Sequence, residues 1–175
     1  MTPSDMPATA GLCQALASVL LQRGWMMATA ESCTGGMIAA ACTDLSGSSQ
    51  WFERGFVTYS NQAKMDLLGV DARTLQSDGA VSEAVARAMV RGALRQAPVQ
   101  VAVAVTGVAG PTGGSAAKPV GTVWFGWNIQ GSVTTQVQRF AGDRAAVRAA
   151  TVQHALAQLL TLTCETPIPP AGNGD

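Results

Sequence analysis

The chain has few of the side chains on which enzymes and metal sites most often depend. Its 175 residues contain one histidine, His154, and one tyrosine, Tyr59. The four cysteines are Cys13, Cys33, Cys42 and Cys164. No two of them form a C-x-x-C pair, so a usual structural zinc site and a disulfide-rich secreted scaffold are both disfavoured, and no metal is expected. The sequence instead predicts four reduced thiols in a cytoplasmic protein.

The chain also lacks an excess of charge and any long apolar run. It has 11 basic and 11 acidic residues, which gives a net charge of zero. Without a basic field, nucleic-acid binding is not expected. No apolar run approaches the roughly 18 residues that span a bilayer, and the N-terminus has no basic region of a signal peptide, so no membrane partner is expected. At 47% hydrophobic the chain can still bury the core of a single domain.

Hydrophobic periodicity predicts alternating helices and strands. Helices are expected over 9–23, from Ser32 or Thr34 to about Leu45, over 61–68, from Ser82 to about Gln96 and from Asp143 to about Leu162. Strands are expected over 25–30, 51–59, 99–105, 121–129 and 132–140. The last two strands form a hairpin with its turn at Gln130 and Gly131. The pattern predicts an α/β layered fold with a mixed sheet.

The first candidate segment lies where a buried strand turns into a helix. It reads Ala30-Glu31-Ser32-Cys33-Thr34-Gly35-Gly36. A serine at such a corner sits over the free N–H groups of the first helical turn, which can stabilise an oxyanion. Gly35 and Gly36 would let a substrate approach the backbone. Two other interpretations stay open: Ser32 or Thr34 is a simple N-cap, or Cys33 is the nucleophile although no histidine adjoins it in sequence.

The second candidate segment joins a strand to a helix and reads Tyr59-Ser60-Asn61-Gln62-Ala63-Lys64. Because no histidine is near, a serine nucleophile needs another base, and a lysine can serve when desolvation lowers its pKa. Tyr59 could relay the proton or polarise Lys64. The alternative is that Lys64 is a solvated surface charge. A short-chain dehydrogenase is rejected, because the spacing differs by one residue and no G-x-G-x-x-G follows the first strand.

The third candidate segment runs from Thr106 to Thr122 and contains a glycine-rich loop, Gly107 to Pro119, that follows a strand. Ligands collect at the carboxyl ends of strands in α/β sheets, and successive N–H groups can form an anion nest. The loop lacks the Gly-Lys-Ser/Thr of an ATP-binding Walker A motif, and a flexible connector is the alternative. The residues expected to bind substrate here are Thr106, Gly107, Ala109, Gly110, Gly113 and Gly114.

Three arginines near the final helix are weaker candidates: Arg139, Arg144 and Arg148. Arg144 opens that helix and could fork onto a phosphate, although such arginines more often belong to a solvated face. His154 lies late on the same amphipathic helix and is interpreted as structural.

These segments together resemble the C-terminal domain of the competence/damage-inducible protein CinA. The matching stretches are Thr29 to Gly36, Gly55 to Lys64, Gly79 to Ser82 and Thr106 to Thr122, within a resemblance that spans residues 10–163. The chain is similar to the stand-alone form of this domain. The resemblance implies a three-layer α/β/α sandwich with a mixed central sheet, here a single domain over 9–164 with disordered tails at 1–8 and 165–175.

The resemblance also implies an activity and the residues that perform it. Family members deamidate nicotinamide mononucleotide to nicotinic acid mononucleotide and ammonia, and the family's catalytic serine, tyrosine and lysine fall on Ser32, Tyr59 and Lys64. No metal or organic cofactor is implied. The partners implied are a small-molecule nucleotide substrate and a second copy of the chain in a homodimer.

We therefore expect an acyl-enzyme route. Lys64, assisted by Tyr59, takes the proton of Ser32, and backbone N–H groups near Cys33, Thr34 and Gly35 hold the oxyanion. The glycine-rich loop and Arg144 cradle the ribose phosphate. The alternative is a catalytically silent nucleotide-binding or competence/DNA-damage-associated module of the same fold.

Overall fold

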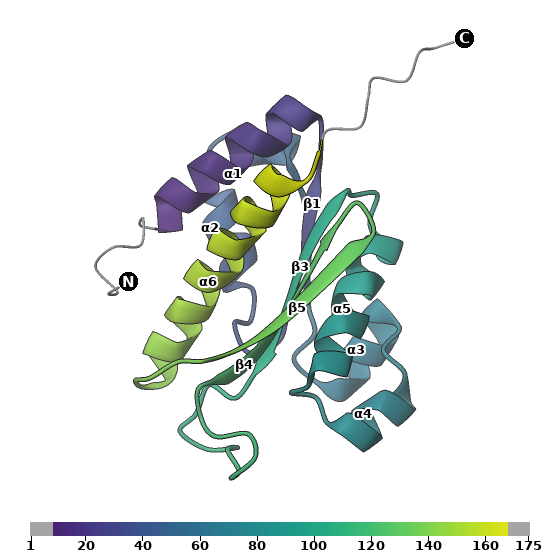
Figure 1. The fold of residues 1–175 in the computed structure, drawn as a ribbon, viewed down its shortest axis with the longest axis vertical. Helices are drawn as coiled ribbons and strands as arrows, with labels where there is room; N and C mark the ends of the chain where they lie inside the picture. The colour runs from purple at the N-terminus through teal and green to yellow at the C-terminus, as the bar shows by residue number, and fades with distance from the viewer. Residues whose placement is uncertain (1–8, 168–175) are drawn as a thin grey trace.

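The computed structural model describes residues 9–167, which form one α/β unit (Figure 1). The elements in chain order are α1 (Thr9–Arg23), β1 (Met27–Glu31), α2 (Met37–Thr43), the 3₁₀ turn η2 (Ser48–Gln50), β2 (Phe52–Val57), α3 (Asn61–Leu68), α4 (Ala72–Asp78), α5 (Glu83–Gln96), β3 (Val101–Gly107), β4 (Thr122–Ile129), β5 (Ser132–Arg139) and α6 (Arg144–Glu165). None of the helices within 9–167 is long and apolar enough to cross a membrane.

The five strands form one mixed sheet in the order β2-β1-β3-β4-β5. Strands β2, β1 and β3 run parallel, whereas β4 pairs antiparallel with both β3 and β5. Helices α1, α2 and α6 cover one face, and α3, α4 and α5 lie on the other side (Figure 1). The three-layer α/β/α sandwich and its mixed sheet are confirmed.

The two faces of β3 explain how the layers pack. The side chains of a strand point to alternate faces, and here Val101, Val103 and Val105 join the core beneath α1, α2 and α6, whereas Ala102 and Ala104 join the core beneath α5. The small alanine face leaves room for α5 to lie close to the sheet. Helix α5 also approaches α3 closely, since a Cβ added at Gly92 would lie 2.1 Å from the Leu68 carbonyl oxygen.

Most predicted elements are confirmed, with shifts at their ends. The helices predicted over 9–23 and 61–68 have those bounds, Ser82 caps α5, and the hairpin turns at Gln130 and Gly131, both with positive φ. Helix α4 was missed, because Leu75 is its one buried residue and leaves no apolar periodicity to find. Helix α6 runs past its predicted end to Glu165, and the remainder of the predicted tails, 1–8 and 168–175, lies outside the described residues.

The parallel strands bring the candidate segments to one edge of the sheet. Ser32 follows β1 directly, Tyr59 lies just beyond β2, and Thr106 is near the end of β3. The chain leaves β1 toward β2 on one side and returns to β3 on the other. Ligands bind at such a reversal of strand order, outside the carboxyl ends of the strands.

Candidate active site

Ser32 and Lys64 meet at this edge of the sheet. The Nζ atom of Lys64 lies 3.0 Å from the Oγ atom of Ser32 and donates a second hydrogen bond, of 2.7 Å, to the carbonyl oxygen of Thr58. Ser32 is itself fixed by its backbone, because its N–H donates to the carbonyl oxygen of Val105 on β3. Lys64 reaches this point from the first turn of α3, whose N-cap is Ser60. The contact between the expected nucleophile and the expected base is present.

Lys64 is buried, so its interpretation as a solvated surface charge is wrong. Its exposed fraction is 1%, and within 9–167 no carboxylate forms a salt bridge with it. Burial without a counter-charge lowers the pKa of Lys64 from the ordinary lysine value, and the neighbouring Cys33 only partly opposes this shift. A neutral amine has a lone pair that can accept the hydroxyl proton of Ser32.

Cys33 has the opposite character to a reactive cysteine. Its side chain is buried, and this burial raises the pKa of the thiol to about 11, although Lys64 and Arg148 both act to lower it. The thiolate is the nucleophilic form of cysteine, and it is scarce near neutral pH at such a pKa. The geometry therefore favours Ser32 over Cys33. All four cysteines are free thiols, as expected from their spacing.

The turn after Ser32 is held by Glu31, which sequence reasoning missed. The fully buried Glu31 carboxylate accepts hydrogen bonds from the Thr34 hydroxyl and from the N–H groups of Gly36, Ile38 and Ala39. It thus caps α2 from outside the helix. The prediction that Ser32 or Thr34 is the N-cap is wrong, because Gly36 occupies that position with a left-handed φ of 103° and no side-chain cap.

Hydrogen bonds within the same turn reduce the number of N–H groups that can bind an oxyanion. The N–H of Gly35 donates to the Ser32 carbonyl oxygen and that of Gly36 to Glu31, so neither is free for a substrate. Gly35 and Gly36 therefore do not supply oxyanion donors; their left-handed φ values let the chain bend, and the close approach of a substrate to them stays a prediction. Within the described residues, the N–H groups of Cys33 and Thr34 have no backbone or side-chain acceptor in another residue. Of these two donors, Cys33 belongs to the lining of the Ser32 cavity, whereas Thr34 is fully buried and lines neither cavity.

Tyr59 pairs with Arg144 rather than with Lys64. The Tyr59 side chain is 63% exposed, and its hydroxyl oxygen accepts a hydrogen bond of 3.0 Å from Arg144. Arg144 donates also to the carbonyl oxygen of Gly110 in the glycine-rich loop. Tyr59 still lines the same cavity as Ser32 and Lys64, but its hydroxyl has no hydrogen bond to either of them.

Fewer residues of the glycine-rich loop line the cavities than the sequence predicts. Thr106 and Gly107 belong to β3, and the Thr106 hydroxyl donates to the Ala80 carbonyl oxygen at 2.7 Å. Together with Ala109 they line the cavity beside Ser32. Gly113 and Gly114 lie farther along and line neither this cavity nor its neighbour, so their assignment to substrate binding is not supported.

Two neighbouring cavities share Ala109 and Arg144. The Ser32 cavity has a volume of about 250 Å³, and the outer cavity, about 640 Å³. The lining of the Ser32 cavity is Ser32, Cys33, Tyr59, Asn61, Lys64, Ala80, Val81, Thr106, Gly107, Ala109 and Arg144. The lining of the outer cavity is Ala109, Pro111, Val120, Gly142, Asp143, Arg144, Ala145 and Arg148.

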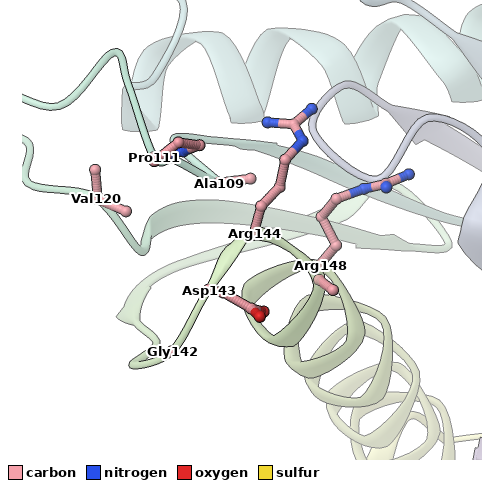
Figure 2. Close-up of a pocket in the computed structure, with 8 residues that line it drawn as sticks. Ala109, Pro111, Val120, Gly142, Asp143, Arg144 and Arg148 are labelled. Atoms are coloured by element: carbon pink, nitrogen blue, oxygen red, sulfur yellow. The ribbon is translucent and has the colours of Figure 1, made fainter.

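Figure 2 shows how Arg144 and Arg148 extend from the beginning of α6 at the outer cavity, on the side of Ala109 and Pro111. The Asp143 carboxylate is instead committed to the helix, where it accepts the N–H of Ala146. Arg148 lines the outer cavity and donates from Nε to the Cys33 carbonyl oxygen at 3.1 Å and from Nη2 to the Thr34 carbonyl oxygen at 3.0 Å.

His154 takes no part in the site. Its ring packs edge-on against Phe125, with centroids 4.8 Å apart, and Nε2 lies 2.9 Å from Gln136 Oε1. Burial lowers the pKa of His154, so the ring stays neutral near pH 7. These contacts agree with a structural role for His154. The one histidine of the chain does not replace Lys64 as a base.

Comparison with known proteins identifies the family of the chain. A family model described as the CinA C-terminal domain matches residues 9–163. A protein of Enterobacter agglomerans named nicotinamide-nucleotide amidohydrolase PncC is 58% identical over 134 residues, which cover 76% of this chain and 82% of that protein. The protein of the same name from Escherichia coli K12 is 50% identical over 149 residues, or 85% of this chain and 90% of that one.

A solved structure has the same fold. The competence damage-inducible protein A (ComA) from Klebsiella pneumoniae subsp. pneumoniae MGH 78578 aligns with a TM-score of 0.89 and 42% sequence identity. The alignment covers 92% of this chain and all of that one.

Proposed function

This chain belongs to the CinA C-terminal domain family, and from that premise we propose that it is an amidohydrolase acting on nicotinamide mononucleotide. The products are nicotinic acid mononucleotide and ammonia. The observation that carries the proposal is the 3.0 Å contact between the Ser32 hydroxyl and the buried amine of Lys64. The names of the relatives supply the substrate class, and this contact supplies the chemistry.

The reaction begins with neutral Lys64 accepting the proton of Ser32 as Oγ attacks the carboxamide carbon. The carbonyl oxygen becomes an oxyanion, which the N–H groups of Cys33 and Thr34 stabilise. Lys64 then returns the proton to the amide nitrogen, the C–N bond breaks, and ammonia leaves an ester on Ser32. A water molecule, deprotonated by Lys64, hydrolyses the ester and restores both side chains.

Tyr59 acts at the mouth of the site in this proposal. Its hydroxyl would have to leave Arg144 to approach the leaving amine, so its part in proton transfer requires a side-chain movement on substrate binding. The bond from Arg144 keeps the phenol near the entrance until then.

The two cavities suit the two ends of the nucleotide. The nicotinamide ring would enter the Ser32 cavity, where the reacting groups are, and the ribose phosphate would lie in the outer cavity. Arg144 lines both, and its guanidinium could turn from Gly110 and Tyr59 to bind the phosphate. No metal or organic cofactor is required by these steps.

An ammonia-release assay on the purified full chain tests the proposed function. Nicotinamide riboside, mononucleotide and dinucleotide are compared at equal concentrations, and the mononucleotide is expected to react fastest. If the protein binds the mononucleotide but releases no ammonia from it, the chain is a silent binding module of the same fold and the proposal is wrong.

Replacing Arg144 tests the phosphate assignment. We expect Arg144→Met to raise KM for nicotinamide mononucleotide about 10- to 100-fold, since a charge-assisted hydrogen bond contributes about 1.5–3 kcal/mol. The KM for nicotinamide riboside, which has no phosphate, should change little. Arg91→Met, which replaces an exposed arginine on α5 that lines neither cavity, is the matched control and should leave both KM values unchanged. Equal effects on both substrates would contradict the assignment.

The homodimer and the cytoplasmic location remain proposals. The homodimer follows from the family resemblance, and sedimentation velocity of the purified chain would test it. The cytoplasmic location rests on the four free thiols, which persist in a reducing compartment.

A further inference from the structure

Arg148 lies next to the reacting groups but has no part in the proposed reaction. Its guanidinium reaches from α6 across 115 residues of sequence to the turn after Ser32. There it donates from Nε to the Cys33 carbonyl oxygen at 3.1 Å and from Nη2 to the Thr34 carbonyl oxygen at 3.0 Å. Gly35 does not crowd this contact: a Cβ added at Gly35 would lie 3.6 Å from Arg148 Nη2, an ordinary van der Waals distance.

The first of these bonds acts on the Thr34 N–H. The carbonyl of Cys33 and the N–H of Thr34 belong to the same peptide unit, so a cation at the oxygen polarises the N–H at the other end. Hydrogen bonds in such a chain strengthen one another. Thr34 N–H is one of the two donors that remain free beside Ser32.

The second bond leads to the Cys33 N–H through one more step. The carbonyl of Thr34 shares its peptide unit with the N–H of Gly35, which donates to the Ser32 carbonyl oxygen at 3.0 Å. That carbonyl shares its peptide unit with the N–H of Cys33. Both free donors therefore lie at the end of a hydrogen-bond chain that begins at Arg148.

Glu31 holds the other side of the turn. Its carboxylate takes the N–H groups of Gly36, Ile38 and Ala39, which occupies the anion-attracting end of α2. The helix terminus is therefore not free for an incoming oxyanion, and of the two N–H groups without an acceptor that of Cys33 belongs to the lining of the Ser32 cavity.

We propose that Arg148 is a positioning residue that fixes and polarises the two backbone donors of the oxyanion hole, Cys33 N–H and Thr34 N–H. The inference rests on the proposed amidohydrolase function. Its effect belongs to the transition state, because the charge on the substrate oxygen develops only there.

Kinetics of Arg148 variants test this inference. Removing one oxyanion donor costs about 100- to 1,000-fold in kcat. Because Arg148 acts through the donors, we expect Arg148→Met to lower kcat about 10- to 100-fold with KM nearly unchanged. Arg148→Lys keeps a donor for one carbonyl and should fall between Arg148→Met and the unsubstituted protein. Arg23→Met is the matched control, since Arg23 also donates to two carbonyl oxygens, those of Thr166 and Cys164, at the far end of α6.

An NMR measurement separates this inference from the proposed function. We expect the amide proton resonances of Cys33 and Thr34 to move upfield in Arg148→Met and to stay in place in Arg23→Met, whether or not the chain releases ammonia. If wild-type protein is inactive, the proposed function fails and the shifts still report on the polarisation. Unchanged kcat in folded Arg148→Met, or unmoved amide resonances, would overturn the inference.

Discussion

Ser32→Ala is expected to lower kcat for nicotinamide mononucleotide by roughly 10⁴-fold or more, as for the loss of other nucleophiles that act as part of a unit. The physical reason is the loss of the one side-chain oxygen within 9–167 that is hydrogen-bonded to the Lys64 amine. Binding should persist, because the cavity walls and Arg144 are unchanged. Ammonia release measures kcat, and calorimetric titration measures Kd of the substrate.

The control for this variant is Ser132→Ala, an exposed serine at the start of β5 near the opposite end of the sheet. It should keep full activity. The double variant Ser32→Ala/Lys64→Met should be no slower than Ser32→Ala alone, because members of one catalytic unit are not additive. In acid-quenched wild-type protein, mass spectrometry should find the acyl ester of nicotinic acid mononucleotide, with its ribose phosphate, on the peptide containing Ser32. Substantial turnover by Ser32→Ala would exclude Ser32 as the nucleophile.

The pairing of Ser32 with Lys64 could be predicted because it depends on the direction of the strands. Ser32 follows β1, and Lys64 lies in the first turn of α3, the helix that follows β2. Once β1 and β2 are parallel neighbours, their carboxyl ends must lie side by side. The position of such a motif in the fold can therefore be predicted in part from its place at the end of a strand.

The contacts of Tyr59 and Arg148 could not be predicted in this way. Each depends on the rotation of α6 about its axis and its position over the sheet, which are set by packing across 85 and 115 residues of chain. The hydrophobic pattern places α6 on the sheet, but it does not say which loop atoms a given arginine reaches. Arg148 is for this reason indistinguishable in sequence from an arginine on a solvated face.

Glu31 was missed for a local reason. A serine or threonine before a helix is the common N-cap, so Ser32 and Thr34 drew the assignment. The carboxylate of Glu31 can serve α2 only because Gly35 and Gly36 bend the chain with consecutive left-handed φ values of 60° and 103°. The two glycines are visible in the sequence. A pair of glycines, which adopt positive φ readily, shortly after an acidic residue is the signal that could have indicated this arrangement.

Lys64→Met should separate catalysis from stability. Methionine matches the length of the lysine stem but has no amine, so we expect activity to fall by roughly 10⁴-fold. The lowered pKa of Lys64 means that burial disfavours its charged form in the folded protein. The unfolded chain thus binds more protons than the folded one between the lowered pKa and the ordinary lysine value, and wild-type stability rises with pH over that interval.

The stability of Lys64→Met should lack this rise. Near pH 7 the variant should unfold at a temperature no lower than wild type, despite the lost hydrogen bond to Thr58, because an apolar side chain has no charge to desolvate. As the pH increases toward the ordinary lysine pKa, the stability of wild type should increase relative to that of the variant. Thermal unfolding at several pH values measures the unfolding temperature, and urea unfolding measures the free energy of unfolding.

The same pKa should govern the activity of the wild-type protein. A base must be neutral to accept the Ser32 proton, so kcat/KM should increase with pH and level off below the ordinary lysine pKa of 10.5. The kinetic midpoint should coincide with the pH at which the stability difference between wild type and Lys64→Met begins to change, because both report the pKa of the amine in the folded protein. A kinetic midpoint at the ordinary lysine value, or a variant that is much less stable than wild type at pH 7, would mean that Lys64 is not a desolvated base.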